Sequence, residues 1–216
     1  MPYLLRRLLL MPSILLAGVL PLSIAHTADL SATPPLFQEG KDYIRSPAAV
    51  TLATPDQHEV VELFWYGCSY CYKLEPTARE WLKHKSENVV FTRIAVAFGA
   101  DWEPGARAYY AAEALGVLNK VHQPLFDAIH REKRKLNTED ELATFFAQQG
   151  VDQETFRRAY RSFQTETQLR RSNQLAQRYG IHSVPAVIVN GQYDVRAPQM
   201  FEVVDFLIAK PTVPQG

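Results

Sequence analysis

The sequence contains few cysteines and has no excess of charge of either sign. Only two of its 216 residues are cysteine, and 23 Lys and Arg residues balance 23 Asp and Glu residues. The cysteine count excludes a disulfide-dense miniprotein. The charge balance gives no basic surface of the kind that nucleic-acid-binding modules carry, so we expect no nucleic-acid partner. With 47% hydrophobic and 21% charged residues, the chain has the composition of a globular protein with a sizeable core. Its length predicts one domain, or one domain that carries an insertion.

Long uncharged apolar runs are absent except near the start of the sequence. There, two arginines precede an apolar run over 8–25 that contains no charged residue. A basic start followed by such a run predicts a cleaved signal peptide over residues 1–25, and therefore a function outside the cytosol. Cleavage after Ala25 fits the preference for small residues best, and cleavage after Ala28 is an alternative. An uncleaved membrane anchor is a further alternative, which two prolines in the run disfavour.

The remaining sequence predicts an α/β fold in which helices interrupt a small sheet. Strand-like and helical patterns follow one another in the order βαβ, then helices only, then ββα. We expect a sheet domain formed by 26–102 and 180–216, with an all-helical insertion over 103–179. The individual segments are strands at 43–45, 59–66, 89–98, 186–189 and 192–195, and helices at 68–85 and 199–209 on either side of the helical block.

Turn and cap signals support these boundaries. Asn190-Gly191 predicts a two-residue hairpin turn, and Thr138 with Glu141 forms the pattern of a helix-capping box. Asp152 is a second candidate helix start. Glycines at 116, 150 and 180 are placed where helices of the block are expected to end. About five helices therefore fit into the insertion.

The two cysteines occur as Cys68-Ser69-Tyr70-Cys71, between a predicted strand and a predicted helix. This is the context in which a C-x-x-C pair carries redox chemistry. Residues three apart on a first helical turn lie within reach of a disulfide bond. At the helix start, free backbone N–H groups and the helix dipole stabilise a thiolate on Cys68. We therefore expect Cys68 to be the exposed attacking thiol and Cys71 the buried resolving thiol.

Two other interpretations of the pair have less support. A structural zinc site needs four ligands, and the histidines at 58, 84, 122, 130 and 182 are scattered, so we expect no metal and no other cofactor. An inert surface disulfide would leave the position between strand and helix unexplained.

Beyond the cysteines, several segments resemble the DsbA-type periplasmic thiol:disulfide interchange proteins of the thioredoxin superfamily. They are Phe37-Gln38-Glu39-Gly40-Lys41-Asp42-Tyr43, Glu62 before the cysteines, Cys68 to Tyr72, Ala114-Leu115-Gly116, Val184-Pro185-Ala186, and Val189 to Tyr193. The resemblance implies a thioredoxin-like fold with an inserted helical domain. It also implies a monomer in the periplasm that oxidises reduced exported proteins and is reoxidised by a membrane quinone-linked reoxidase of the DsbB type.

The resemblance also assigns residues around the cysteines. Pro185 corresponds to the family's cis-proline, which faces the cysteines, and the backbone of Val184 is then a candidate substrate-binding position at an exposed strand edge. Strongly oxidising members of the family commonly carry Pro-His between the cysteines, whereas this chain carries Ser69-Tyr70. Because a tyrosine adds no positive charge, stabilisation of the Cys68 thiolate is expected to depend more on the helix start, and Ser69 and Tyr70 are candidate redox-tuning residues.

Glu62 is a carboxylate within an otherwise apolar strand. Such a group is costly to bury unless it is paired or protonated, so we expect a raised pKa or a cationic partner, for which Arg93 is the candidate. By resemblance, Glu75 is the second acid of the cluster. The functional interpretation is proton transfer to or from Cys71. The alternative is a structural ion pair that points to the edge of the sheet.

Three functions compete on this evidence. The first is an oxidase that donates the Cys68–Cys71 disulfide to exported proteins. The second is an isomerase or reductase of the same superfamily. Extracytoplasmic isomerases usually carry a separate N-terminal dimerisation domain, for which the roughly 30 residues between the signal peptide and the first long strand are too few. The third is a non-catalytic thioredoxin-fold binding module, and the presence of both cysteines argues against it.

Overall fold

A computed structural model describes residues 36–47, 54 and 56–210 of the chain. The predicted signal peptide, with both candidate cleavage sites, lies outside these residues. In the described part, no helix has the length and apolar character needed to cross a membrane. The elements are β1 (Tyr43–Arg45), β2 (His58–Phe64), α1 (Ser69–His84), β3 (Val89–Ala95), α2 (Glu103–Ala114), α3 (Leu118–His130), α4 (Glu139–Gln148), α5 (Gln153–Tyr160), α6 (Phe163–Tyr179), β4 (Ala186–Val189), β5 (Tyr193–Val195) and α7 (Met200–Ala209).

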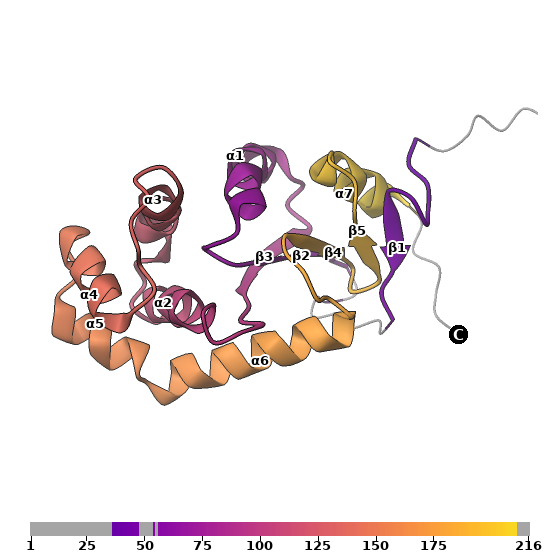
Figure 1. Cartoon of the computed structure of the whole chain (residues 1–216). Coiled ribbons are helices and arrows are strands. Elements are labelled where there is room, and N and C mark those ends of the chain that lie inside the picture. Colours follow the sequence, from indigo (N-terminus) through magenta and orange to yellow (C-terminus); the bar gives the residue numbers. More distant parts are fainter. Residues whose placement is uncertain (1–35, 48–53, 55, 211–216) are drawn as a thin grey trace, which may run out of the picture. The chain divides into compact units, whose positions relative to one another are not determined.

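The strands form one five-stranded sheet in the order β1-β5-β4-β2-β3. β2 and β3 are parallel, and the other neighbours are antiparallel. The predicted order of βαβ, a helical block and ββα is confirmed. In Figure 1, α1 and α7 cover one face of the sheet, and α6 runs along the other.

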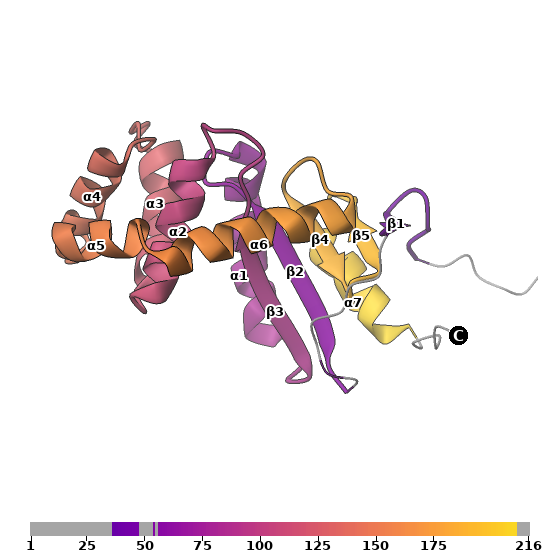
Figure 2. The ribbon, with the colours of Figure 1, turned by 90° about the horizontal axis from the view of Figure 1, so that it is seen from below.

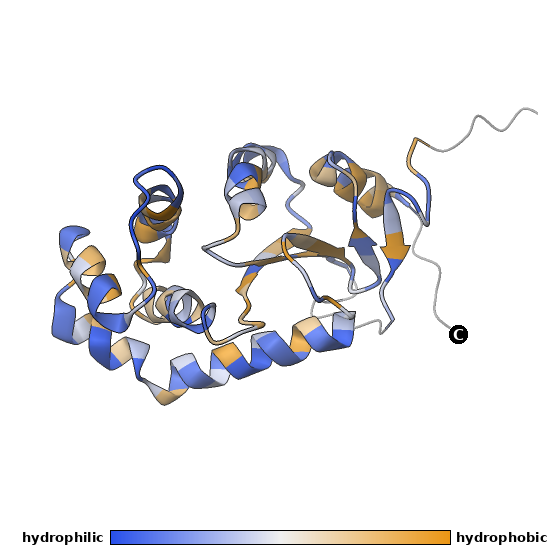
Figure 3. Ribbon diagram, in the orientation of Figure 1, coloured by the Kyte–Doolittle hydropathy of each residue, from blue (hydrophilic) through white to orange (hydrophobic). Residues whose placement is uncertain are grey.

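β2 is buried on both faces because helices cover both sides of the sheet. Val60 packs with residues of α1 and α7, whereas Val61 and Leu63 pack with α6. Successive side chains of a strand point to opposite faces, so Glu62 projects to the same side as Val60, beneath α1. The sequence position of Glu62 thus decides that its carboxyl group enters the layer between the sheet and the helix that carries the cysteines. In Figure 3 the hydrophobic colour lies on β2 and β4, while most of α6 has the hydrophilic colour.

The helical block consists of α2 to α6, the five helices expected. Its predicted caps are confirmed: Thr138 and Glu141 form a capping box, the Asp152 side chain accepts a hydrogen bond from the Thr155 N–H, and Gly180 ends α6 with φ of 69°. Figure 2 shows that α6 starts beside α5 and then extends beneath the sheet. The domain boundaries remain a prediction, since α6 packs against both parts.

The structure corrects some of the expected strand positions. β2 ends at Phe64 and β3 at Ala95, each earlier than predicted. After Phe64 the chain turns, with the Cys68 N–H donating to the Trp65 carbonyl at 3.0 Å. The exposed strand edge expected next to Pro185 is wrong, because β4 lies between β2 and β5 and is paired on both sides. Only the segment that precedes β4, which contains Val184, lies outside the sheet.

Candidate active site

Cys68 caps the N-terminus of α1. Its Sγ accepts a hydrogen bond from the backbone N–H of Cys71 at 3.1 Å, and the side chain is half-buried. The pKa of Cys68 is lowered to about 7 by a hydrogen bond from the Cys71 thiol and by the N–H groups of Cys71 and Tyr70, against the opposing effect of burial. Close to neutral pH, a large part of Cys68 is therefore the reactive thiolate.

Cys71 lies one helical turn further on and is completely buried. Burial, together with its hydrogen bond to Cys68, raises the pKa of the Cys71 thiol far above its ordinary value. The two thiols thus differ in exposure and acidity in the sense expected of an attacking and a resolving cysteine. The assignment of these roles remains a prediction.

The dipeptide between the cysteines faces solvent. Ser69 is exposed, and Tyr70 is 70% exposed. The ammonium group of Lys73 lies 5.3 Å from the centre of the Tyr70 ring. Tyr70 therefore acts on the Cys68 sulfur mainly through its backbone N–H, whereas its aromatic ring contacts the Lys73 ammonium group at the surface.

The segment before β4 passes next to Cys68. The Val184–Pro185 peptide bond is cis, in agreement with the resemblance. The Sγ of Cys68 donates to the carbonyl oxygen of Val184 over 3.5 Å. The backbone of Val184 is thus the part of this segment that lies against the reactive sulfur.

A cluster of buried charges lies behind the cysteines. Glu62 and Glu75 are 0% and 1% exposed, and Arg93 bridges them with distances of 3.0 Å to Glu62 Oε2 and 3.2 Å to Glu75 Oε2. Arg93 is opposite Glu62 in the pairing of β2 with β3. The expected cationic partner is therefore confirmed. Glu62 is fully buried, and its partner Arg93 lies on β3, the edge strand of the sheet, so the structural ion pair and the role in proton transfer both stay predictions.

The two acids of this cluster have different proton affinities. Burial raises the pKa of Glu62 to about 7, with Arg93 opposing this shift and Glu75 adding to it. Burial also raises the pKa of Glu75, but the hydrogen bond from His122 and the nearby cations outweigh it, so the net pKa is lowered. The other oxygen of Glu62, Oε1, is buried and has no hydrogen-bond partner among the described residues. Near neutral pH, Glu62 is thus the acid that can hold and release a proton.

Sequence reasoning missed His122, which it considered only as a metal ligand. His122 lies on α3, and its Nε2 is 3.1 Å from Glu75 Oε1, while its Nδ1 is 2.8 Å from the hydroxyl of Tyr66. No local sequence pattern predicts this contact, since His122 lies 47 positions after Glu75 in the sequence. A histidine on the apolar face of a helix was the only available signal.

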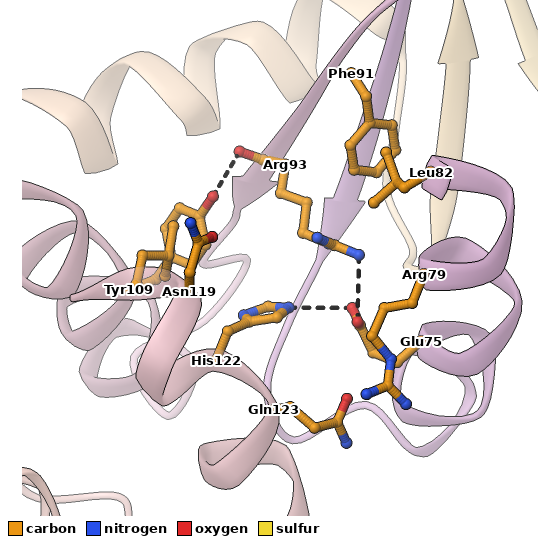
Figure 4. A pocket seen from close by; sticks show the side chains of 10 residues that line it. Glu75, Arg79, Leu82, Phe91, Arg93, Tyr109, Asn119, His122 and Gln123 are labelled. Atoms are coloured by element: carbon orange, nitrogen blue, oxygen red, sulfur yellow. Dashed lines mark hydrogen bonds and ion pairs between the residues drawn. The ribbon is translucent and has the colours of Figure 1, made fainter. Parts of the chain in front are cut away.

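Figure 4 shows His122 and Arg93 pointing at Glu75 from two sides. A cavity of about 420 Å³ adjoins these three residues, and Arg79 and Tyr109 also line it. Across the described ranges, no group of three or more His, Cys, Asp or Glu side chains is arranged to hold a metal ion.

Comparisons with known proteins agree with this geometry. Residues 83–207 match the family model of a DSBA-like thioredoxin domain. The chain is 40% identical to a thiol:disulfide interchange protein DsbA of Azotobacter vinelandii, with 83% of each chain covered, and 39% identical to that of Burkholderia cepacia, with 89% and 95% covered.

Among solved structures, too, DsbA proteins are similar to this chain. The crystal structure of Pseudomonas aeruginosa DsbA has a TM-score of 0.74 and 37% identity, covering 80% of this chain and 93% of that one. DsbA from Xylella fastidiosa also has a TM-score of 0.74, with 30% identity and coverage of 79% and 95%. The thioredoxin-like fold with a helical insertion is thereby confirmed. From its fold, its cysteine pair and these relatives, the chain belongs to the DsbA family of thiol:disulfide interchange proteins.

Proposed function

We propose that this protein is a periplasmic oxidase that donates the Cys68–Cys71 disulfide to reduced exported proteins. One observation carries this proposal. A half-exposed thiol with a pKa lowered to about 7 lies one helical turn from a buried thiol with a raised pKa. Stabilising the Cys68 thiolate stabilises the reduced form of the pair, and a disulfide whose reduced form is stabilised is a good oxidant.

The exchange proceeds in two steps. A substrate thiolate attacks Sγ of Cys68, the bond between Cys68 and Cys71 breaks, and a mixed disulfide with the substrate forms. A second substrate thiolate then attacks the substrate's own sulfur, and Cys68 leaves as a thiolate. The substrate loses two electrons and forms a disulfide, and the protein gains these electrons as a dithiol.

Glu62 supplies a proton for the first step. Cys71 leaves as a thiolate in a fully buried position, where a charge is costly. A carboxyl group with a pKa of about 7 can hold a proton in the resting protein and transfer it to Cys71 at near-neutral pH. Glu62 thereby converts the buried Cys71 thiolate into a neutral thiol as the bond breaks.

The segment with Val184 and Pro185 positions the substrate. The Val184 backbone lies against Cys68, so an extended substrate chain that binds there brings its own cysteine next to the attacked sulfur. After turnover, a quinone-linked membrane reoxidase of the DsbB type restores the disulfide. In this proposal the protein acts as a monomer, and residues 1–25 direct its export.

Trapping of substrates tests the mechanism. Cys71→Ser cannot hold the internal disulfide, so its Cys68 thiolate should attack disulfides of oxidised exported proteins and release one substrate thiolate. The mixed disulfides should accumulate, because the Cys71 thiol that would release Cys68 from them is missing, and Cys68→Ser should accumulate none. Adducts on the Cys68→Ser variant instead of Cys71→Ser would reverse the assigned roles.

The direction of electron flow is tested separately by equilibrating the wild-type pair with reduced and oxidised glutathione. A dithiol that persists at high ratios of oxidised to reduced glutathione supports the oxidase. A disulfide that persists in an excess of reduced glutathione would instead identify a reductase.

A further inference from the structure

His122 connects the helical block to the buried acids behind the cysteines. It is 8% exposed, and its two ring nitrogens face different partners, Glu75 at 3.1 Å and the Tyr66 hydroxyl at 2.8 Å. Both partners are buried, and Tyr66 precedes Cys68 by only two residues. A single side chain of α3 therefore contacts both the acid cluster and the segment that carries the reactive cysteine.

The orientation of the His122 ring is fixed by aromatic neighbours. Its centre lies 5.3 Å from that of Phe64 and 5.2 Å from that of Phe126, with the ring planes at 84° and 81°. The Tyr66 ring adds a tilted contact at 5.4 Å. Close packing on these sides prevents the imidazole from turning, so each nitrogen keeps its partner.

The hydrogen bonds determine where the imidazole carries its proton. Burial raises the pKa of Tyr66 well above 10, so its hydroxyl keeps its proton and donates it to Nδ1. Nε2 must then carry the hydrogen that is donated to the Glu75 carboxylate. Burial also lowers the pKa of His122, with Glu75 opposing this shift and Arg93 and Arg79 adding to it. A neutral imidazole protonated at Nε2 satisfies both partners.

This arrangement makes the two buried acids unequal. Arg93 contacts both Glu62 and Glu75, and one guanidinium can balance the charge of only one carboxylate. Glu75 receives a second donor, from His122, while Oε1 of Glu62 has no hydrogen-bond partner in the described part of the chain. The negative charge is therefore best placed on Glu75, and the proton on Glu62.

We propose that His122 is a positioning residue of the exchange reaction, which holds the charge on Glu75 and thereby keeps the exchangeable proton of the buried pair on Glu62. The role of that proton in the reaction rests on the proposed function. The other groups that face Glu75 are Arg79 on α1, Arg93 on β3 and Glu62 on β2, and none of them is altered by a change at position 122.

Three variants separate the hydrogen bond from packing. His122→Gln keeps an N–H donor at about the distance of Nε2 and can still reach Glu75. His122→Asn keeps a polar group near the position of Nδ1, but it is too short to reach Glu75. Tyr66→Phe removes the hydroxyl on the other side of the ring and leaves the bond to Glu75 in place. Thermal unfolding of each variant checks that it is folded.

The first measurement is a pH titration of the carboxyl ¹³C signals of Glu62 and Glu75 in the oxidised protein, where neither cysteine titrates. In the wild type we expect Glu62 alone to titrate between pH 5 and 9. In His122→Asn, Glu75 should gain a titration step in this range, because losing a hydrogen bond to a charged group shifts a pKa by about one unit or more. His122→Gln and Tyr66→Phe should retain the wild-type pattern.

The second measurement is the pH dependence of the rate at which the oxidised protein oxidises a reduced two-cysteine peptide. The alkaline limb of this profile should move by about one pH unit in His122→Asn and return to its wild-type position in His122→Gln. Equal changes in the Asn and Gln variants, or a wild-type pattern in both, would overturn the proposal. If the wild type itself does not oxidise the peptide, the proposed function fails, and the ¹³C titration still decides the role of His122.

Glu75→Gln provides a test that does not depend on the folding of the His122 variants. With one acid removed, Arg93 faces only Glu62, so the titration of Glu62 should move to lower pH. An unchanged Glu62 titration would show that the two acids do not share the arginine, and it would overturn the proposal as well.

Discussion

Replacing Glu62 by glutamine should stabilise the reduced protein against unfolding, increasingly so as the pH rises. Burial raises the pKa of Glu62 in the folded protein, from 4.5 to about 7. An acid with a raised pKa favours the folded state at pH values below its unfolded pKa. This contribution is lost as the pH rises to the folded pKa, because the unfolded chain releases the proton first. Glutamine remains neutral throughout and does not incur this loss.

The size of the effect follows from the shift. The change from 4.5 to about 7 is about 2.5 pKa units. At 1.36 kcal/mol per unit, this corresponds to about 3 kcal/mol. The stability difference between Glu62→Gln and wild type should therefore grow by about 3 kcal/mol between pH 4 and pH 8, and it should remain constant above that. Most of the growth falls between pH 4.5 and 7.

Urea denaturation of both proteins at a series of pH values, with reductant present throughout, measures this difference. Glu80→Gln, on helix α1, is the control with an exposed acid. Glu80 is exposed, and its hydrogen bond from Lys83 lowers its pKa, so its pH dependence has the opposite sign. A stability difference for Glu62→Gln that stays level from pH 4 to 8 would refute the conclusion that burial dominates the proton affinity of Glu62.

Three further predictions follow from the active-site helix and from the helical block. In the reduced protein, the rate at which iodoacetamide alkylates Cys68 should rise with pH with a midpoint near pH 7, while Cys71 should react slowly because it is buried. Mass spectrometry of the digested protein identifies the labelled residue. Faster labelling of Cys71 would contradict the geometry. Tyr70→His should make the disulfide more oxidising by up to about 30 mV, the equivalent of one pKa unit at Cys68, because solvent screens a charge on a residue that is 70% exposed. Equilibration with glutathione measures this shift, and an unchanged potential would show that the backbone N–H groups already determine the thiolate energy. Thr138→Ala should reduce the free energy of unfolding by about 1 kcal/mol, since it removes the capping box of α4. Thr144→Ala in the same helix should have a smaller effect. Urea denaturation measures both, and equal losses of stability in the two variants would argue against the cap.

The sequence alone determined the features that depend on neighbouring residues. The position of Cys68 at the start of a helix follows from the apolar strand before it and the helical pattern after it, and the hairpin turn at Asn190-Gly191 follows from the backbone conformations that these residues accept. Both residues of that turn have positive φ, 50° and 63°, but Val189 pairs with Tyr193, so three residues rather than the two expected connect β4 and β5. Local preferences of this kind act over a few residues and can be identified without knowledge of the fold.

The tertiary structure decided which groups surround the cysteines. The apolar residues around Glu62 indicated that its carboxyl group is buried, but only the pairing of β2 with β3 brings Arg93 opposite to it. β4 was expected to leave an exposed edge next to Pro185, and it lies inside the sheet because β5 folds back beside it. His122 reaches Glu75 from a helix 47 positions further along the chain. The proton affinity of a buried acid depends on the sum of such distant contacts, which a sequence pattern does not contain and only the packing of the helical block against the sheet creates.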